Sequence, residues 1–95
     1  MSSSLEDAIA QALDRPAAYV LLGSDGEYLY KGACRNLRER LKDHQAGRAS
    51  RTKNRRPLQV VSAEYFDDYR DALQRETWLK SGVGRDWIRQ RLKAS

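Results

Sequence analysis

The stretch AAYVLLGSDGEYLYKGA, residues 17–33, decides how the rest of the chain is organised. Residues 17–22 form an unbroken apolar run of the kind found in buried strands, and the glycine-rich GSDG that follows is typical of a turn. Residues 27–33 alternate tyrosines with other side chains, as a half-buried strand does. The stretch therefore predicts a β-hairpin that carries Tyr19 on one strand and Tyr30 on the other.

Helices and one more strand are predicted around this hairpin. Before it, residues 5–13 have apolar side chains at helical spacing with Ser4 as N-cap, which makes residues 1–15 a helical extension. The elements after it are a helix over 35–46 ended by Gly47, a basic loop over 48–57, a third strand over 58–66, a helix over 68–80 stopped by the Ser-Gly-Val-Gly of 81–84, and a helix over 85–93. This order predicts an α+β domain with a small, mostly antiparallel three-stranded sheet flanked by helices.

Length and composition describe one small domain over residues 1–95, of which 40 % are apolar. Cys34 is the only cysteine, so an internal disulfide and a cysteine-rich metal site are excluded. No apolar run approaches the roughly 18 residues of a membrane span. Residues 1–13 carry acids where a signal peptide carries bases, and we therefore expect a soluble cytoplasmic protein with no membrane partner.

Positive charge is concentrated in the middle of the chain. The net charge is +5, yet residues 31–56 alone carry +8 and the remainder carries −3. Thirteen of the 18 bases are arginine, whose planar guanidinium matches phosphate. The pattern favours a polyanion such as nucleic acid as the partner over a merely solvated loop. The candidate substrate-binding residues are Lys31, Arg35, Arg38, Arg48, Arg51, Lys53, Arg55 and Arg56.

The helix predicted over residues 35–46 places two polar side chains on its apolar stripe. With Leu37 at 0°, Leu41 falls at about 40°. His44 then falls at about 340° and Arg40 at about 300°, so both face the sheet. Taken alone, this pattern is more typical of a satisfied core histidine and a rim arginine than of a site.

The helix predicted over residues 68–80 carries a carboxylate in the same way. Its inner face is defined by Tyr69, Ala72 and Leu73. Glu76 falls at about 340°, in the middle of that face. Burying an unpaired carboxylate costs several kcal/mol, so Glu76 needs a cation: Lys80 one turn later, Arg40 from the other helix, or a metal ion. Together with the tyrosines of the hairpin, these side chains supply the groups that hydrolyse a phosphodiester.

The same residues follow the motifs of a known family, the GIY-YIG nuclease domain. Tyr19 and Tyr30 stand eleven positions apart, as the two motif tyrosines do. The segment YKGACRNLRERLKDH, residues 30–44, resembles the family's YIG-x-[ST]-x-NLxxRLxxH. LQRETWLK, residues 73–80, resembles its A-x-x-RE-x-x-LK helix. The resemblance covers nearly all of residues 17–93, and the ordered combination of motifs is specific.

The resemblance implies an α/β/α sandwich, one Mg²⁺ or Mn²⁺ ion and a set of site residues. The residues that match the family's catalytic positions are Tyr19, Tyr30, Arg40, His44 and Glu76, the last being the metal-binding glutamate. We expect Tyr19 to accept the proton of the attacking water, with His44 as its partner or substitute and nearby cations lowering the tyrosine pKa. Arg40 is expected to stabilise transition-state charge, and Tyr30 to orient water or phosphate.

The chain departs from the family's motifs at four positions. Ala17 and Ala18 replace the glycine and isoleucine of the first motif, and Lys31 replaces the isoleucine of the second. Neither change removes a group that does chemistry. Ala33 stands where some members carry a lysine that assists the reaction, so we assign no such role to that position.

The sequence thus predicts a metal-dependent endonuclease that cuts DNA with little sequence specificity, including single-stranded or branched DNA. Family members act in DNA repair, and no zinc finger or helix-turn-helix is present to read sequence. These residues distinguish neither DNA from RNA nor a monomer from a weak homodimer. Two alternatives stay open: a catalytically silent nucleic-acid-binding module of the same fold, and a small interaction protein whose basic segment meets an acidic protein surface.

Overall fold

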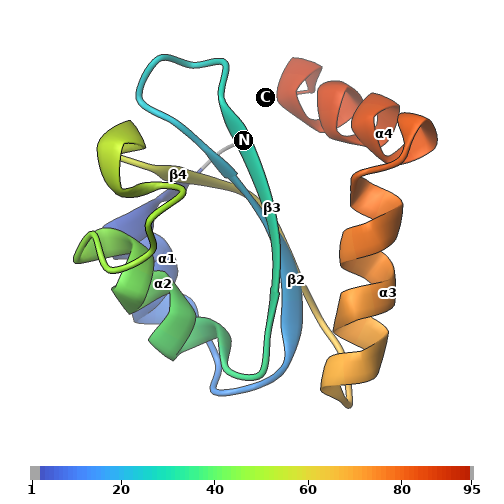
Figure 1. Ribbon diagram of the computed structural model, residues 1–95, viewed down its shortest axis with the longest axis horizontal. Helices are drawn as coiled ribbons and strands as arrows, with labels where there is room; N and C mark the ends of the chain where they lie inside the picture. Colours follow the sequence, from blue (N-terminus) through green and yellow to red (C-terminus); the bar gives the residue numbers. More distant parts are fainter. Residues whose placement is uncertain (1–2, 95) are drawn as a thin grey trace.

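A four-stranded antiparallel sheet forms the centre of the structure, a computed structural model that describes residues 3–94 (Figure 1). The strand order is β1-β4-β2-β3. The strands are β1 (Ser3–Ser4), β2 (Ala17–Leu22), β3 (Leu29–Cys34) and β4 (Gln59–Tyr65). The prediction of three strands is wrong by one, because β1 has only two residues, exists through its pairing with β4 and has no sequence pattern of its own.

The predicted hairpin is confirmed as β2 and β3, which pair from Ala17 opposite Cys34 to Leu22 opposite Leu29. Its turn is closed by the Asp25 carboxylate, which accepts hydrogen bonds from two backbone N–H groups. Gly26 follows with φ of 76°, a left-handed conformation that glycine adopts without strain. The pairing places β3 at one edge of the sheet, so one side of this strand is left without a neighbouring strand.

Four α-helices complete the fold: α1 (Leu5–Gln11), α2 (Leu37–Gln45), α3 (Tyr69–Leu79) and α4 (Gly82–Lys93). Each begins after a Ser, Asn or Asp whose side chain accepts a backbone N–H three residues later. The expected start of the last helix at residue 85 is wrong, because Ser81 caps the helix and Gly82–Gly84 form its first turn. Within residues 3–94, no helix is long and apolar enough to cross a membrane.

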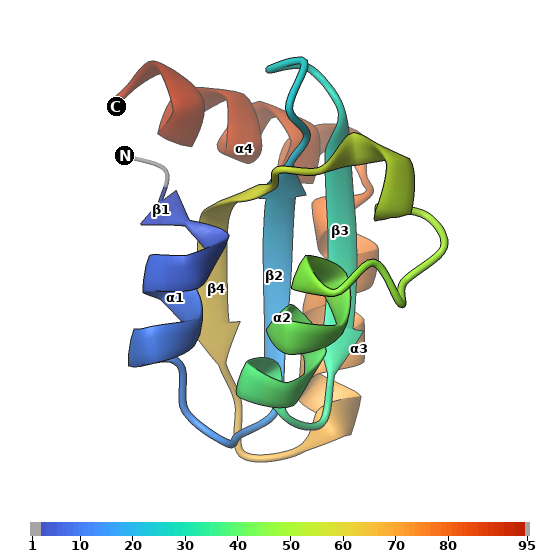
Figure 2. The same ribbon diagram turned by 90° about the vertical axis from the view of Figure 1, so that its left-hand side faces the viewer.

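The helices lie on both faces of the sheet, with α1 and α2 on one face and α3 and α4 on the other (Figures 1 and 2). Residues of β2 alternate between the two layers. Tyr19 and Leu21 pack with α1 and α2, while Ala18 and Val20 pack with α3 and α4. Burial on both sides explains why residues 17–22 read as an unbroken apolar run.

Candidate active site

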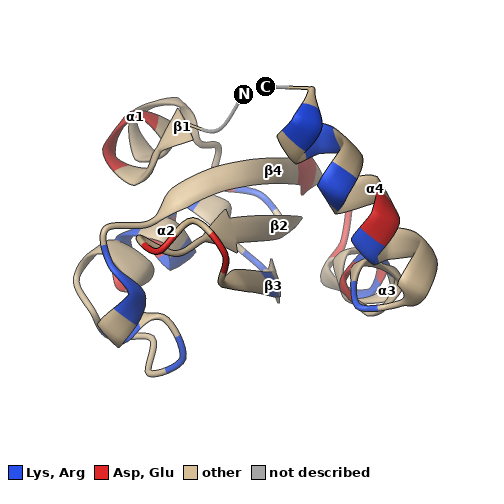
Figure 3. Ribbon diagram, turned by 90° about the horizontal axis from the view of Figure 1, so that it is seen from above, with Lys and Arg blue, Asp and Glu red and all other residues tan. Residues whose placement is uncertain are grey.

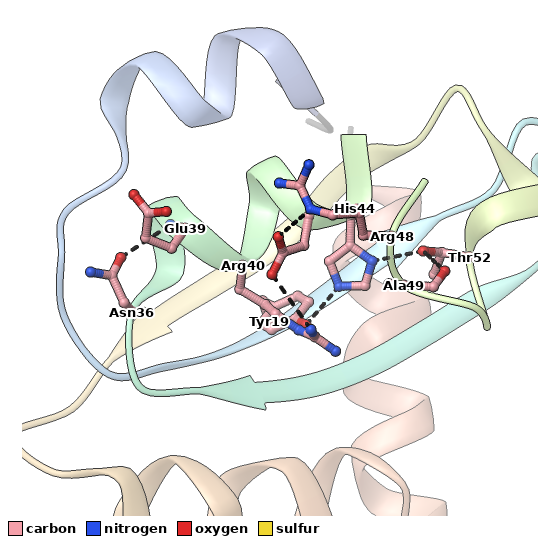
Figure 4. Close-up of polar contacts among 9 residues, drawn as sticks. Tyr19, Asn36, Glu39, Arg40, His44, Arg48, Ala49 and Thr52 are labelled. Carbon is pink, nitrogen blue, oxygen red and sulfur yellow. Dashed lines mark hydrogen bonds and ion pairs between the residues drawn. The ribbon is translucent and has the colours of Figure 1, made fainter. Parts of the chain in front are cut away.

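Two tyrosines and a histidine meet between β2, β3 and α2. Figure 4 shows Tyr19 and His44 of this cluster. The Tyr19 hydroxyl lies 2.8 Å from Nε2 of His44, and both residues are 0 % exposed. The ring of Tyr30, which is partly exposed, lies 5.2 Å from the imidazole and 6.1 Å from the Tyr19 ring, between centroids. The hairpin therefore brings the two phenols together, and the predicted inward orientation of His44 on its helix is confirmed.

Gly32 makes room for this cluster. It lies directly opposite Tyr19 in the sheet. A Cβ at this position would stand 2.5 Å from Cζ of Tyr19 and 2.9 Å from Cε2 of Tyr30, both far inside van der Waals contact. The glycine of the second motif is thus required by the packing of the two rings on each other.

Arg40 approaches the tyrosines from α2. Its guanidinium hydrogen-bonds the hydroxyls of Tyr19 and Tyr30 and lies 3.8 Å from the carboxylate of Asp43. Burial alone would lower the Arg40 pKa, but the two hydroxyls outweigh it and the net pKa is raised. Arg40 also lines a shallow cavity of about 410 Å³ that includes Tyr69 of α3, so part of the guanidinium stays within reach of a ligand.

His44 makes a second buried hydrogen bond that the sequence did not predict. Its Nδ1 lies 2.7 Å from Oγ1 of Thr52, which is itself completely buried. Thr52 lies in the irregular segment after α2, where no periodicity marks one residue as inward-facing. Desolvation, followed by the nearby charge of Arg40, lowers the His44 pKa to about 4. The imidazole is therefore neutral near pH 7.

The Tyr19 pKa shifts in the direction opposite to the one expected. Burial raises it well above the ordinary value of a phenol, and interaction with Tyr30 raises it further. The hydrogen bond and charge of Arg40 lower it, but only in part. Tyr19 is thus a neutral phenol near pH 7. It can accept a proton only if it gives its own hydroxyl proton to a neighbouring group.

Glu76 reaches the site from the opposite face of the sheet. Its side chain, 21 % exposed, lines a cavity of about 420 Å³, and Oε1 lies 3.6 Å from Nζ of Lys80. The sequence left Lys80, Arg40 or a metal ion as the possible cation beside Glu76. Among the described residues, Lys80 is the cation that pairs with it. The other residues that line this cavity are Tyr28, Leu29, Tyr30, Lys31 and Arg51. Tyr30, Arg51 and Lys31 thus bring the hairpin and the basic loop to the carboxylate.

Glu76 lies at the margin of its helix's buried face, not in the middle of it. The residues of α3 that are fully buried are Ala72 and Leu79, while Leu73 is 38 % exposed. The buried face is therefore centred about 50° away from Glu76. The marginal position explains how this carboxylate avoids the cost of full burial and still faces a cavity.

Tyr30 of the edge strand connects the surroundings of Arg40 with those of Glu76. Tyr30 of β3 hydrogen-bonds Arg40 from the α2 side and lines the Glu76 cavity on the α3 side. Because β3 has no strand beyond it, the site wraps around its open edge. We name Tyr19, Tyr30, Arg40, His44 and Glu76 the edge site.

Glu76 supplies the carboxylate of the edge site, the side chain there whose chemistry suits a hard metal ion. Among residues 3–94, no three histidine, cysteine, aspartate or glutamate side chains gather as a ready-made metal cage. A single carboxylate beside a cavity suits Mg²⁺, which keeps several waters and takes one or two carboxylates together with substrate phosphate. The donor chemistry of the edge site therefore fits one hydrated divalent ion.

The structure divides the eight candidate substrate-binding residues into groups. Lys31 and Arg51 line the Glu76 cavity, and Arg35 lines the Arg40 cavity. Arg48 pairs with Asp43, which also lines the Arg40 cavity. Three others are held away from both cavities: Arg38 by Asp14 and the Ala12 carbonyl, Arg55 by Asp25 and the Tyr28 ring, and Arg56 by two carbonyls. Lys53 and Arg56 line a separate cavity beside α1. Lysines and arginines also lie along α4, on the far side of the sheet (Figure 3).

Lys31 adds positive charge to the Glu76 cavity. Its pKa is lowered first by partial burial and then by the charges of Arg85 and Lys80. Arg85, at the start of α4, and Lys80, at the end of α3, are cations near the site that the sequence pattern did not single out as substrate-binding. The cavity therefore combines one carboxylate with several cations, which suits a metal-bound phosphate.

Comparisons with known proteins identify relatives of this chain. The GIY-YIG catalytic domain family matches residues 16–90. A UPF0213 protein of Lactiplantibacillus plantarum is 40 % identical over 82 residues, covering 83 % of this chain and 80 % of the relative. A UPF0213 protein of Staphylococcus saprophyticus is 36 % identical over 70 residues, covering 73 % and 84 %. No solved structure gives a significant match.

Proposed function

Because the chain belongs to the GIY-YIG catalytic domain family, we propose that it is a divalent-metal-dependent endonuclease that cuts DNA with little sequence specificity. The family points to a nuclease that hydrolyses phosphodiester bonds. The observation that carries the finer proposal is the edge site, where Arg40 and Glu76 reach Tyr30 from opposite faces of the sheet. In the reaction, a water oxygen forms a bond to phosphorus and one ester P–O bond breaks, which leaves a phosphomonoester and a hydroxyl.

Glu76 is the residue that would hold Mg²⁺ or Mn²⁺. When bound there, the ion supplies charge neutralisation at a nonbridging or leaving phosphate oxygen. Glu76 must first release Lys80, whose ammonium lies 3.6 Å away on the helix surface. Lys80 is itself more than half exposed, so its ammonium can return to water when an ion takes its place.

Arg40 stabilises the charge that develops on the phosphate in the transition state. Its guanidinium is partly exposed and oriented by the two tyrosine hydroxyls. Donors that are fixed in place before the reaction act where charge appears and need no rearrangement. Lys31 and Arg51 in the neighbouring cavity hold the flanking phosphates of the strand. Such contacts position the backbone and carry no sequence information.

Tyr19 and His44 accept the proton of the attacking water together. We place that water between Arg40 and the partly exposed Tyr30, because Tyr19 itself has no exposed surface. As the water proton moves to Oη of Tyr19, the phenol proton moves to Nε2 of His44, 2.8 Å away. His44 is neutral near pH 7 and can accept it. Bound phosphate next to Arg40 offsets part of the charge that lowers the His44 pKa and so strengthens this base.

The natural substrate that we propose is DNA with accessible single strands, such as flaps, branches or nicked duplex, in a repair process within the cytoplasm. A shallow site on a sheet edge accepts a strand from outside without enclosing it. One edge site cuts one strand at a time, so the proposal needs only a monomer. A weak homodimer would allow both strands of a duplex to be cut.

A silent nucleic-acid-binding module of the same fold is the alternative. Such a module needs the basic residues, but it does not need the Glu76 carboxylate among cations. It also does not need the buried hydrogen bond between Tyr19 and His44. The basic loop by itself favours neither function. Cleavage therefore decides between the two.

The test is incubation of the purified protein with end-labelled single-stranded, duplex and branched DNA. Each substrate is assayed with Mg²⁺, Mn²⁺ or EDTA, beside Glu76→Ala and Arg40→Ala. We expect cleavage only with metal, and a loss of at least 100-fold in both variants. Asp71→Asn is the matched control, because it removes an exposed carboxylate from the same helix.

Two results would overturn the proposal. Equal cutting by the wild type and Glu76→Ala would mean that the activity comes from a contaminant. Metal-independent binding by all proteins, with no cleavage of any substrate, would assign the chain to the silent module.

A further inference from the structure

We propose that Thr52 is a positioning residue that fixes the tautomer of His44, so that Nδ1 carries the proton and Nε2 faces Tyr19 as a hydrogen-bond acceptor. The consequence for reaction rate rests on the proposed nuclease function. The tautomer itself is a property of the folded protein and can be measured without any substrate.

The direction of the hydrogen bonds at Thr52 supports this assignment. A threonine hydroxyl has one proton to donate. The Thr52 hydroxyl donates it to the carbonyl oxygen of Ala49, 3.4 Å away. Nδ1 of His44, at 2.7 Å, could either donate or accept, but both contacts are hydrogen bonds at once only when the hydroxyl donates to the carbonyl and accepts from Nδ1, which requires a proton on Nδ1. The other ring nitrogen of a neutral imidazole is then without a proton.

The contacts at Tyr19 lead to the same tautomer from the other end. Arginine can only donate, so the Tyr19 oxygen accepts the hydrogen bond from Arg40. The Tyr19 proton is then available for Nε2 of His44. In this arrangement every donor points one way, from Arg40 through Tyr19, His44 and Thr52 to the Ala49 carbonyl. Figure 4 marks the Tyr19–His44 and His44–Thr52 contacts of this series. With the opposite tautomer, the Tyr19 oxygen would accept two hydrogen bonds and its own proton would be left without this partner.

Burial makes the Thr52 contact decisive for the imidazole. His44 and Thr52 are both 0 % exposed, so water does not replace a lost partner easily. A buried imidazole without a partner at Nδ1 loses the interaction that favours one tautomer over the other. Thr52 also follows Arg51, which lines the Glu76 cavity, and precedes the short 3-10 helix Lys53–Arg55. The same residue therefore anchors the basic loop beneath the edge site.

The experiment is ¹⁵N NMR of the folded protein labelled at histidine, because His44 is the only histidine in the chain. The two ring nitrogens report directly which of them carries the proton. We expect Nδ1 protonated and Nε2 unprotonated near pH 7 in the wild type and in Thr52→Ser, which keeps the hydroxyl. In Thr52→Val, which keeps the shape without the hydroxyl, the Nε2-protonated tautomer becomes populated.

Nuclease rates complete the test. Thr52→Val is expected to lower kcat about 10–100-fold with little change in KM, the usual cost of removing the group that orients a functional histidine, and Thr52→Ser restores it. Ser62→Ala is the matched control, since it removes a buried hydroxyl that has no hydrogen-bond partner among the described residues. It should leave both the tautomer and kcat unchanged.

The outcomes separate this proposal from the proposed function. A wild type with the proton on Nε2, or a Thr52→Val variant that folds with an unchanged tautomer, would overturn the role of Thr52 whatever the nuclease activity. If Thr52→Val does not fold, the wild-type spectrum and Thr52→Ser still decide. An Nδ1-protonated histidine in a protein that cuts no DNA would keep the tautomer assignment and reject the nuclease.

Discussion

His44 is buried as a neutral base between two hydroxyl groups. Its environment favours the neutral imidazole, because desolvation and the charge of Arg40 both oppose protonation. The unfolded chain has no such preference and protonates this side chain near pH 6.5. The histidine therefore links the stability of the fold to pH, independently of any nuclease activity.

We predict that the free energy of unfolding changes little just above pH 7 and falls as the pH drops from about 6.5 to about 4. In this window the unfolded state binds more protons than the folded state, so stability rises with pH. The difference in pKa corresponds to roughly 2–4 kcal/mol. Urea titrations at several pH values measure it, and in His44→Gln this pH dependence should largely disappear.

Two features make the pH prediction specific. The Asp25 carboxylate, whose pKa is lowered by the N–H groups of Tyr28 and Glu27, loses its contribution only around and below its ordinary value of 3.8. It therefore acts at lower pH than His44. A stability that stays flat between pH 7 and pH 5 would contradict the assignment of His44 as a buried neutral base.

Gly32 is the second residue whose identity the site dictates. In Gly32→Ala, the new Cβ would overlap the rings of Tyr19 and Tyr30, which must then move. We predict a loss of about 1–3 kcal/mol in stability and a fall of at least 10-fold in cleavage rate, because overpacking displaces the tyrosines. Near-ultraviolet circular dichroism and urea unfolding measure the first effect, and single-turnover cleavage the second. An alanine variant as stable and active as the wild type would refute this explanation of the motif glycine.

At the scale of elements, the position of Glu76 depends on how α3 packs against α4. The two helices touch at Gly84, where a Cβ would meet the backbone of α3, at the Trp78 carbonyl and 2.6 Å from Cα of Leu79. Trp78 and Trp87 pack edge to face across the same contact, with ring centroids 5.9 Å apart. A change at this contact therefore alters the helix that carries the carboxylate.

We predict that Gly84→Ala destabilises the protein by about 3 kcal/mol or more, because backbone atoms cannot move aside as a flexible side chain can. Gly82→Ala in the same first turn is the control. A Cβ there meets no atom within 4 Å, and replacing glycine in a helix should stabilise the fold by about 0.4–1 kcal/mol. Thermal unfolding compares the two. Equal stability of both variants would show that α3 and α4 do not pack as described.

Most elements follow from local sequence patterns, and the exceptions have physical causes. The hairpin and α2 have clear periodicity and strong turn or cap residues, so sequence predicts them well. The first turn of α4 contains two glycines, which have low helix propensity. The turn is helical nonetheless, because Ser81 caps it and it packs against α3. Leu73 was expected to face inward together with Ala72, but the position of α3 on the sheet buries Ala72 and Leu79 and leaves Leu73 38 % exposed.

At the scale of the molecule, the edge site combines residues from both helical layers at the open side of β3. Sequence reasoning predicted its five side chains. Polar groups on apolar helical stripes indicated Arg40, His44 and Glu76, and the hairpin with its motif spacing added Tyr19 and Tyr30. Sequence reasoning did not show that Arg40 and Glu76 come from opposite faces of the sheet, because a helical wheel has no information on which face a helix covers. Nor did it find Thr52, which acts through a tertiary hydrogen bond in a segment without periodicity.

The distribution of charge predicts which lysine and arginine side chains contact DNA. Arg51 lines the Glu76 cavity, whereas Arg89 lies on α4 and pairs with Asp86. We predict that Arg51→Gln lowers the slope of log K against log salt concentration by about 0.7–0.9, the loss of one phosphate contact, while Arg89→Gln leaves it unchanged. Fluorescence anisotropy with labelled single-stranded DNA in EDTA measures the slopes. An unchanged slope in Arg51→Gln, or equal effects of the two variants, would place the DNA elsewhere.

The most direct measurement of the edge site as one catalytic unit is a double-mutant cycle. It compares single-turnover cleavage of one DNA substrate by the wild type, Arg40→Ala, Glu76→Gln and the double variant. If both side chains act on the same phosphate, each single change slows cleavage at least 100-fold and the double variant is little slower than the worse of the two. Rate losses that multiply would mean that Arg40 and Glu76 act independently and would contradict a single site around the edge of β3.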